Sequence, residues 1–203
     1  MSKNLAKRDY VRITFIGICL AFFTVPILRN VIDPTFLKAI YFPLYFVIWV
    51  LAANVGLLIA GIISEKIPVF LQISKFVAVG AFNTFLDWGI VNGLIFLLDM
   101  HGSREFVIFK TLSFLIANVA SFFWNKSWTF QVSNESSSKD YVQFLIVSAI
   151  GLLINVGVAY LTKEMKPELI SEGLWTQISL LMATVFSMVW NFLGYKFIVF
   201  KSS

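Results

Sequence analysis

The amino-acid sequence predicts an all-α, polytopic membrane protein with six transmembrane helices, of which the last four form a parallel two-helix repeat. The composition, six apolar runs and a repeated residue pattern support this prediction. Of the 203 residues, 59% are hydrophobic and only 13% are charged, whereas soluble domains are about half apolar and a quarter charged. A spanning helix needs about 20 apolar residues, so six helices leave short loops and no room for a catalytic domain outside the membrane.

Six apolar runs are separated by short polar or charged segments. The first follows a basic segment, and because no small-x-small cleavage pattern comes after it, we expect it to remain as a spanning helix. The expected spans are residues 13–28, 39–64, 76–98, 109–128, 142–162 and 174–195. Residues 132–139 are expected to form a polar loop.

Small residues at four-residue spacing predict faces where helices cross closely. In the second run these are Ala52, Gly56 and Ala60. In the third run they are Gly89 and Gly93, and in the fifth run Gly151 and Ala159 lie four residues before and after Asn155.

Few residues of this chain suit metal binding or catalysis. The single cysteine, Cys19, allows no intrachain disulfide, and the single histidine, His101, lies in a short polar loop and makes a poor metal site. No phosphate-cradling glycine loop or nucleophile triad is present, so neither an enzyme nor a cofactor is expected. The net charge of +5 comes from basic residues beside the apolar runs. This placement favours lipid headgroups over nucleic acid as the partner.

The positions of Lys and Arg predict that both termini are cytoplasmic, because cytoplasmic loops carry the excess of basic residues. Ten basic residues fall on the side of the termini: Lys3, Lys7, Arg8, Arg12, Lys66, Lys75, Lys126, Lys139, Lys196 and Lys201. Six fall on the other side: Arg29, Lys38, Arg104, Lys110, Lys163 and Lys166. The expected location is the cell (inner) membrane.

The third and fourth runs are repeated as the fifth and sixth. Residues 75–89 align with residues 143–157, with identities at Phe76/Phe144, Val79/Val147, Ala81/Ala149 and Gly89/Gly157, and with Asp87 opposite Asn155. Residues 121–130 align with residues 191–200, with identities at Phe122/Phe192, Lys126/Lys196 and Phe130/Phe200. The two offsets, 68 and 70, differ by two residues. Because the units are separated by two spans, they are expected to point the same way.

The same residues carry a resemblance to a known family. Lys75-Phe-x-x-Val-Gly-x-x-Asn83-Thr-x-x-Asp87 is followed by Ala117-x-x-x-Ser-Phe-x-x-Asn125-Lys126-x-Trp-Thr-Phe130 and by Asn191-Phe-x-x-x-Lys196-x-x-Val-Phe200. This set resembles the GtrA-like family of small four-span membrane proteins. The resemblance covers residues 71–203 as a four-helix domain. Residues 1–70, a basic segment and a two-helix hairpin, are an addition to the usual pattern.

The resemblance implies a role in moving a polyprenyl-phosphate-linked sugar across the membrane for cell-surface polysaccharide or glycan synthesis. An alternative that it also implies is a non-transporting anchor or partner of a glycosyltransferase. Related four-span units occur fused to polyprenyl-phosphate mannose synthases. The expected partners are therefore the lipid-linked sugar, the bilayer, a membrane glycosyltransferase and a second copy of the chain.

Four polar residues are candidates for a sugar-binding path inside the bundle. Asp87 lies 11 positions into its span, roughly 16 Å deep and close to the midplane. A carboxylate there normally faces the bundle interior or a wet cavity. Asn83 lies one turn earlier on the same face, and Asn118 and Asn155 are expected at similar depth. Alternatively, these side chains only join helices through hydrogen bonds worth about 0.6 kcal/mol each.

Three lysines are candidates for binding the phosphate. Lys126 and Lys196 stand at the predicted cytoplasmic ends of their spans, in equivalent repeat positions, and Lys75 begins the third span. An ammonium at this depth can bind a lipid phosphate as a point charge. The neighbouring motif residues Asn125 and Asn191 complete the candidate set. The alternative is that the lysines only set topology and extend to the interface.

Asp87 also leaves a third function open, a small proton-coupled exporter in which this carboxyl carries the proton. An ionised Asp87 repels phosphate. We therefore expect it to contact sugar hydroxyls, or a proton linked to transport, rather than the phosphate itself.

Overall fold

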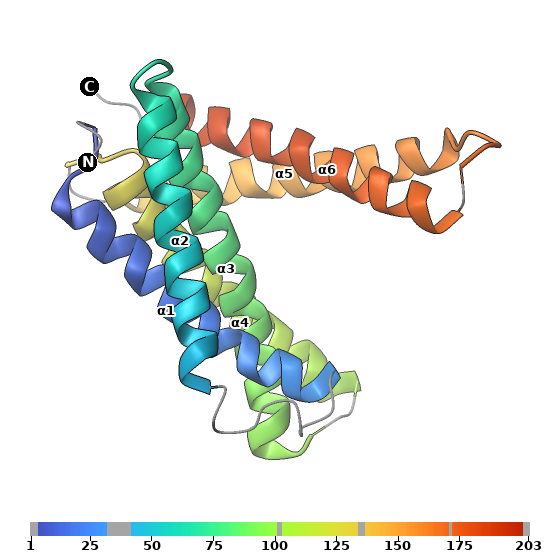
Figure 1. Ribbon diagram of the computed structural model, residues 1–203. Coiled ribbons are helices and arrows are strands. Elements are labelled where there is room, and N and C mark those ends of the chain that lie inside the picture. Colours follow the sequence, from blue (N-terminus) through green and yellow to red (C-terminus); the bar gives the residue numbers. More distant parts are fainter. Residues whose placement is uncertain (1–3, 32–41, 101–102, 134–136, 171, 201–203) are drawn as a thin grey trace. The chain divides into compact units, whose positions relative to one another are not determined.

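A computed structural model describes residues 4–31, 42–100, 103–133, 137–170 and 172–200. Within these ranges the regular secondary structure is entirely helical (Figure 1), which confirms the all-α prediction. Among the described residues, five helical segments are long and apolar enough to cross a membrane: Lys7–Pro26, Pro43–Ser64, Val69–Leu98, Ser138–Thr162 and Leu181–Val199. The protein is therefore a multi-pass membrane protein. His101 lies outside the described residues.

Each predicted span corresponds to one α-helix. The helices are α1 (Lys7–Val31), α2 (Phe42–Ser64), α3 (Val69–Leu98), α4 (Ser103–Trp124), α5 (Ser138–Glu164) and α6 (Glu172–Gly194). Helix α3 begins at Val69 rather than at Phe76, because the helix continues through polar residues that a hydropathy pattern assigns to a loop. Lys75 therefore lies inside α3.

Two short π-helices follow α4 and α6 directly. They are η3 (Asn125–Thr129) and η4 (Tyr195–Val199), and their first residues are 70 positions apart. In η3 the amide of Phe130 donates to the Asn125 carbonyl at 2.9 Å, and in η4 the amide of Phe200 donates to the Tyr195 carbonyl at 2.7 Å. The offset of 70 equals the spacing found for this part of the sequence, so the repeat is confirmed in the backbone conformation.

The chain forms two compact units, residues 1–131 and 132–203. The first contains α1 to η3, and the second contains α5, α6 and η4. Packing therefore groups α1 and α2 with α3 and α4. A division into homologous parts at residue 70 remains a prediction, because it concerns ancestry rather than contacts.

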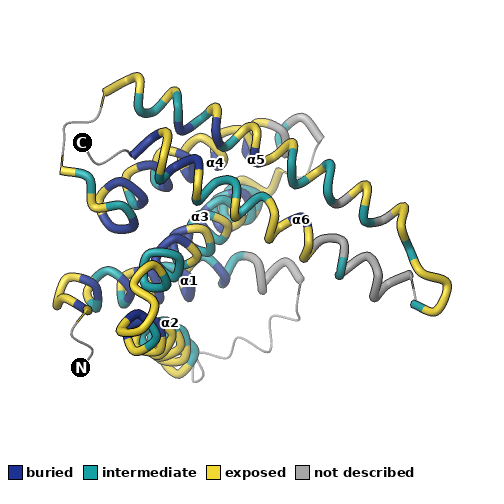
Figure 2. The backbone as a smooth tube through the Cα atoms, turned by 90° about the horizontal axis from the view of Figure 1, so that it is seen from above, coloured by how far each residue is buried: buried dark blue, intermediate teal, exposed yellow. Residues whose placement is uncertain are grey.

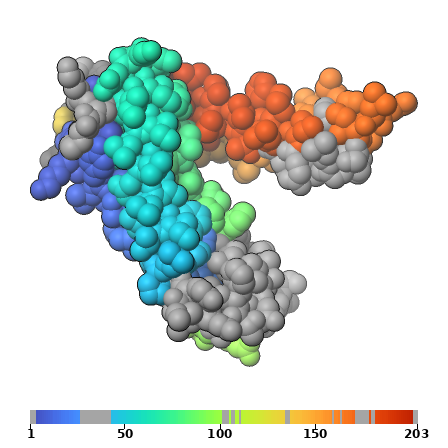
Figure 3. Space-filling view, in the orientation of Figure 1, coloured from blue at the N-terminus to red at the C-terminus, as the bar shows by residue number. Residues whose placement is uncertain are grey.

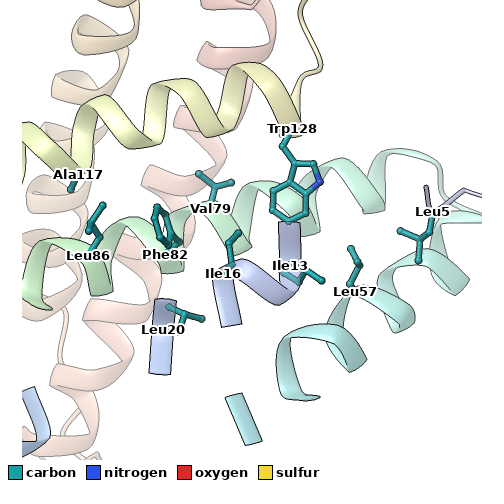
Figure 4. Packing of buried hydrophobic residues seen from close by; sticks show 10 residues of the cluster. All are labelled: Leu5, Ile13, Ile16, Leu20, Leu57, Val79, Phe82, Leu86, Ala117 and Trp128. Carbon is teal, nitrogen blue, oxygen red and sulfur yellow. The ribbon is translucent and has the colours of Figure 1, made fainter. Parts of the chain in front are cut away.

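The core of the first unit lies where α1, α3 and η3 meet. The Trp128 side chain is fully buried among Ile13, Ile16 and Val79 (Figure 4). Helix α1 packs on both α2 and α3, and α3 packs on α4. A Cβ added at Gly89 would lie 2.6 Å from the Phe23 side chain. The predicted close crossing at Gly89 is therefore confirmed, and its partner is α1.

The second unit is a hairpin of α5 and α6 held by aromatic packing near η4. The rings of Phe144 and Tyr195 stack with centroids 4.4 Å apart. The Tyr195 hydroxyl bonds with the Ser148 hydroxyl at 2.7 Å, and Trp190 Nε1 donates to the Val147 carbonyl at 3.0 Å. Gly151 faces Asn191 closely, as the small-residue pattern predicted.

Large apolar side chains cover the outer faces of the helices. Exposed positions run along α2 and along α5 (Figure 2), and α2 presents a broad surface in the space-filling view (Figure 3). A soluble monomer rarely exposes such continuous apolar surface. These faces suit the hydrocarbon of a bilayer.

Three local predictions are wrong. The predicted loop at 132–139 is too long, because Ser137 and Asp140 form a capping box that begins α5 at Ser138. On α2 only Ala60 of the small-residue stripe is buried. A Cβ added at Gly56 or Gly93 would meet no atom within 4 Å. Both glycines border apolar cavities instead of crossing helices.

Candidate functional site

A buried ion pair joins the N-terminal helix to the motif residues. The Asp9 carboxylate on α1 accepts a hydrogen bond from Lys75 Nζ at 2.6 Å and one from Trp128 Nε1 at 2.8 Å. Its second oxygen accepts from the Ala6 amide at 2.9 Å. The Lys75 and Asp9 side chains are only 4% and 5% exposed. A buried pair with further hydrogen bonds repays the desolvation of both charges, so this contact fixes α1 against α3 and η3.

Trp128 holds the lysine from a second direction. Lys75 Nζ lies 5.8 Å from the centre of the indole ring, within the range of a cation–π attraction. The same indole donates to Asp9 through Nε1. One side chain therefore orients both members of the ion pair.

Two arginines of α1 reach the end of η3. Arg8 donates from Nη2 to Gln131 Oε1 at 3.0 Å, and Arg12 donates from Nη1 to the Ser127 carbonyl at 2.9 Å. Four residues separate them, so they lie on one face of the helix. With Lys75 and Asp9, they give this end of the first unit a surplus of positive charge.

The motif asparagine and threonine of η3 each hold a buried oxygen without a partner. Asn125 is 1% exposed and donates from Nδ2 to the Ser121 carbonyl at 3.0 Å, while its Oδ1 has no hydrogen bond. Thr129 is 2% exposed, and its Oγ1 also has none. The motif lysine of η3, Lys126, is 7% exposed. π-Helical turns often occur at functional sites, and this turn gathers two buried polar atoms without a hydrogen bond beside the buried motif lysine.

A polar cavity of about 260 Å³ opens beside η3. Its polar lining comes from Gln72, Lys75, Thr129 and Gln131. Gln72 donates from Nε2 to the Thr129 carbonyl at 3.3 Å. Thr129 and the paired Lys75 therefore border the same space.

Asp87 lies in the interior of α3, 18 residues after Val69, which is roughly 27 Å along a helix of about 45 Å. The Ser113 hydroxyl on α4 donates to Asp87 Oδ1 at 2.6 Å. One turn earlier, Asn83 Oδ1 is buried without a hydrogen bond. Asn118 on α4 is also buried. Asp87, Asn83 and Asn118 thus belong to one unit, and the Asp87 carboxylate joins α3 to α4.

The second unit carries a related but different set. Asn155 donates from Nδ2 to the Ser187 hydroxyl at 3.1 Å, so a polar contact again joins the two helices of the hairpin. Asn191 Oδ1 is buried without a hydrogen bond. Lys196 Nζ lies 5.6 Å from the Phe192 ring centre and 5.7 Å from that of Phe197. The lysine at the second position of each π-helix is thus repeated in both units.

The contacts of Asp9 with Lys75 and Trp128 have no counterpart at the matching positions of the second unit. Gln143 stands in place of Lys75, and Ile198 stands in place of Trp128. Gln143 carries no positive charge, and Ile198 has no indole N–H to donate. The second repeat therefore keeps the lysine of the π-helix but lacks the lysine that pairs with Asp9 in the first unit.

The sequence pattern does not identify Asp9, Arg8 or Arg12 as candidate site residues, because Arg8 and Arg12 belong to the basic N-terminal segment and Asp9 stands alone within it. One signal was available: Asp9 is the acid within a run of basic residues at the predicted membrane face. Among the described residues, no group of three or more His, Cys, Asp or Glu side chains could hold a metal ion.

Comparison with known proteins identifies the family. The family model described as GtrA/DPMS, transmembrane domain, matches residues 75–200. The chain is also 29% identical over 141 residues to the uncharacterized membrane protein YngA of Bacillus subtilis (strain 168), an alignment covering 70% of this chain and 85% of that protein. No solved structure matches significantly. The matched residues run from Lys75 to Phe200 and include α3 to η4, so the chain belongs to the GtrA/DPMS transmembrane domain family.

Proposed function

We propose that the protein moves a polyprenyl-phosphate-linked sugar across the membrane for cell-surface glycan synthesis. Membership of the GtrA/DPMS family supports the broader statement, a glycan-related function in the membrane. Members of this family are generally non-catalytic membrane units, which agrees with transport rather than chemistry.

The observation that carries the proposal is a set of buried oxygens without partners. Within the described residues five such side-chain atoms occur, and three belong to predicted site residues: Asn83, Asn125 and Asn191. Leaving a buried acceptor unpaired costs about 1–3 kcal/mol. Sugar hydroxyls donate hydrogen bonds and would recover that free energy at each position. Unpaired amide oxygens within each unit suit a sugar better than an apolar solute.

The lysines would bind the other half of the ligand, its phosphate. Lys126 and Lys196 occupy the second position of η3 and of η4. An ammonium group binds phosphate as a point charge. In this proposal Asp87, held by Ser113, contacts sugar hydroxyls, because its negative charge would repel the phosphate.

Transport is tested with purified full-length protein in liposomes containing a radiolabelled polyprenyl-phosphate-linked sugar. Periodate outside the vesicles destroys only the sugars of the outer leaflet, so translocation increases the fraction destroyed. We expect faster loss of label than in vesicles without protein. Equal rates would contradict the proposal.

The variant Asn83→Ala links transport to the unpaired oxygen. Removing an unpaired buried acceptor leaves stability unchanged or raises it, so a loss of transport would report function rather than unfolding. We expect about a tenfold lower rate, the equivalent of one or two hydrogen bonds to the sugar. Asn92→Ala is the matched control on the same helix, because Asn92 already donates to the Trp88 carbonyl at 2.8 Å. Equal rates for both variants would remove Asn83 from the path.

The same vesicles separate the proposal from its two alternatives. A glycosyltransferase partner without transport activity would leave the label protected and co-purify with the enzyme. A proton-coupled exporter would need a pH gradient and would move a water-soluble cargo. Movement of the lipid-linked sugar without a gradient would contradict both.

A further inference from the structure

Helix α2 has one face packed inside the first unit and one exposed face. On the packed face Leu57 and Ala60 are buried, and Asn54 donates from Nδ2 to Thr14 Oγ1 on α1 at 3.0 Å. The exposed face carries a continuous row of large apolar side chains, each between 37% and 64% exposed. Figure 3 shows α2 at the surface of the first unit. The row, which we call the α2 seam, consists of Leu44, Ile48, Leu51, Val55, Leu58 and Ile62.

The α2 seam follows a heptad repeat. Its residues are spaced 4, 3, 4, 3 and 4 positions apart, which is the spacing of alternating d and a positions in a coiled coil. Starting from Leu44 at d and Ile48 at a, all three d positions are leucine and all three a positions are β-branched. This combination favours a parallel pair of helices over three or four.

Exposure on an apolar helix does not by itself produce this order. Helix α5 also exposes apolar residues at heptad spacing, but its two sets are mixed in shape. They are Val142, Ala149 and Val156 in one set, and Ile146, Leu153 and Tyr160 in the other. The regular sorting of leucine and β-branched residues is therefore specific to α2 in this comparison.

The membrane supplies the geometry that the pattern requires. Two copies of the chain with the same topology have their α2 helices running in the same direction at the same depth. The two helices can therefore pair in parallel and in register, around a two-fold axis along the membrane normal. Leu44 and Ile62 are 18 positions apart, so the α2 seam extends about 27 Å, close to the roughly 30 Å of the hydrocarbon core.

We propose that the protein is a parallel homodimer in which the α2 seams of two copies interlock as a coiled coil inside the membrane. Each seam residue inserts as a knob into a hole formed by four residues of the partner helix. Between helices in lipid, such van der Waals packing replaces the hydrophobic effect as the driving force. A second copy fits this face because it places leucine beside leucine, and β-branched beside β-branched residues, at every level.

The interface belongs to the additional hairpin, since α2 lies outside the family match at residues 75–200. The dimer does not depend on the proposed function. It assigns a partner to an apolar face that the contacts within the first unit leave exposed.

Cysteine crosslinking tests which face of α2 meets the partner. In a Cys19→Ser background, single cysteines replace residues 47–59 in turn, and full-length protein in native membranes is oxidised with copper phenanthroline. A single cysteine can form a disulfide only with another copy of the chain. We expect maxima at positions 48, 51, 55 and 58, a period of 3.5 residues.

Val55→Cys and Gly56→Cys form a matched pair at nearly the same depth. Both positions are exposed, and an added Cβ at Gly56 meets no atom within 4 Å. Gly56 borders the cavity between α1, α2 and α3 instead of the seam. We expect about tenfold more dimer for Val55→Cys, because a disulfide needs Cα atoms within about 7 Å. Equal crosslinking, which indicates random collision, or a maximum at Gly56 would overturn the proposal.

A change of side-chain shape tests the packing itself. Leu44→Ile, Leu51→Ile and Leu58→Ile together keep the seam apolar but place β-branched residues at both a and d, a pattern that favours three or four helices. The number of copies is counted by stepwise photobleaching of fluorescently labelled protein in liposomes. We expect two copies for the wild type and three or more for this variant.

The matched control makes the same three changes on the exposed surface of α5, at Leu152, Leu153 and Leu161. This control should leave the count at two. A wild-type count of one would overturn the dimer and leave the α2 seam to lipid or to another protein. An unchanged count in the α2 variant, or an equal increase in the α5 control, would overturn the coiled-coil interface.

Transport measured in the same liposomes separates the dimer from the proposed function. A dimer without transport would overturn only the function, and a transporting monomer would overturn only the dimer.

Discussion

At the scale of single residues, the Asp9–Lys75 pair should contribute more to stability than any exposed charge. Replacing Asp9 with Ala leaves the Lys75 ammonium buried without a counter-charge, which costs about 3–5 kcal/mol. We expect the melting temperature to fall by roughly 10 °C. Because Cys19 is the single cysteine and is half-buried on α1, its reaction with a fluorogenic maleimide reports unfolding.

The double variant Asp9→Leu with Lys75→Met should be more stable than either single variant, because removing both charges removes both desolvation costs. Arg12→Gln serves as the control, since its bond to the Ser127 carbonyl is exposed and is worth about 1 kcal/mol or less. Additive losses in the double variant would show that the two residues do not act as a pair.

The sequence predicted Lys75 as a site residue but not its partner. The two residues stand 66 positions apart, and no local pattern relates an acid in a basic N-terminal segment to a lysine in the third span. By contrast, Lys126 and Lys196 are visible in the sequence because they align at equivalent positions of the two repeated segments. Local and repeated features are visible in a sequence, whereas a contact between distant helices depends on packing.

At the scale of helices, glycine positions on α3 distinguish a crossing point from open surface. At Gly89 an added Cβ would lie 2.6 Å from Phe23, so Gly89→Ala must displace that ring at a cost of about 1–3 kcal/mol. At Gly80 nothing lies within 4 Å, and Gly80→Ala should stabilise the helix by up to about 1 kcal/mol. The temperature at which Cys19 becomes reactive should therefore fall for Gly89→Ala and rise for Gly80→Ala. Shifts of equal sign would show that α1 and α3 do not cross at Gly89.

Hydropathy predicted the six helices and their order, but it could not predict the two π-helices. A π-helical turn differs from an α-helical one by a single residue in hydrogen-bond spacing, which leaves the apolar pattern almost unchanged. The start of α5 was missed for a related reason. The Ser137–Asp140 capping box is a polar signal, and polar residues had been assigned to the loop.

At the scale of the molecule, the family match and the compact units divide the chain differently. The match covers residues 75–200, whereas the first unit joins α1 and α2 to the first repeated hairpin. The additional helices are thus packed against family residues such as Val79 through α1 residues such as Ile16. This packing explains how a segment outside the family pattern can contribute to a site within it.

The proposed function requires Lys126 and Lys196 to face the same leaflet, which holds only if the two hairpins are parallel in the membrane. Four exposed positions test this in a Cys19→Ser background: Glu65→Cys, Asp99→Cys, Ser133→Cys and Glu168→Cys. Because basic residues favour cytoplasmic termini, a membrane-impermeant maleimide should label the variants at Asp99 and Glu168 in intact cells. The variants at Glu65 and Ser133 should react only after the membrane is permeabilised. Labelling at Ser133 and Glu168 from the same side would show that the two hairpins are not parallel and would contradict the requirement that both lysines face one leaflet.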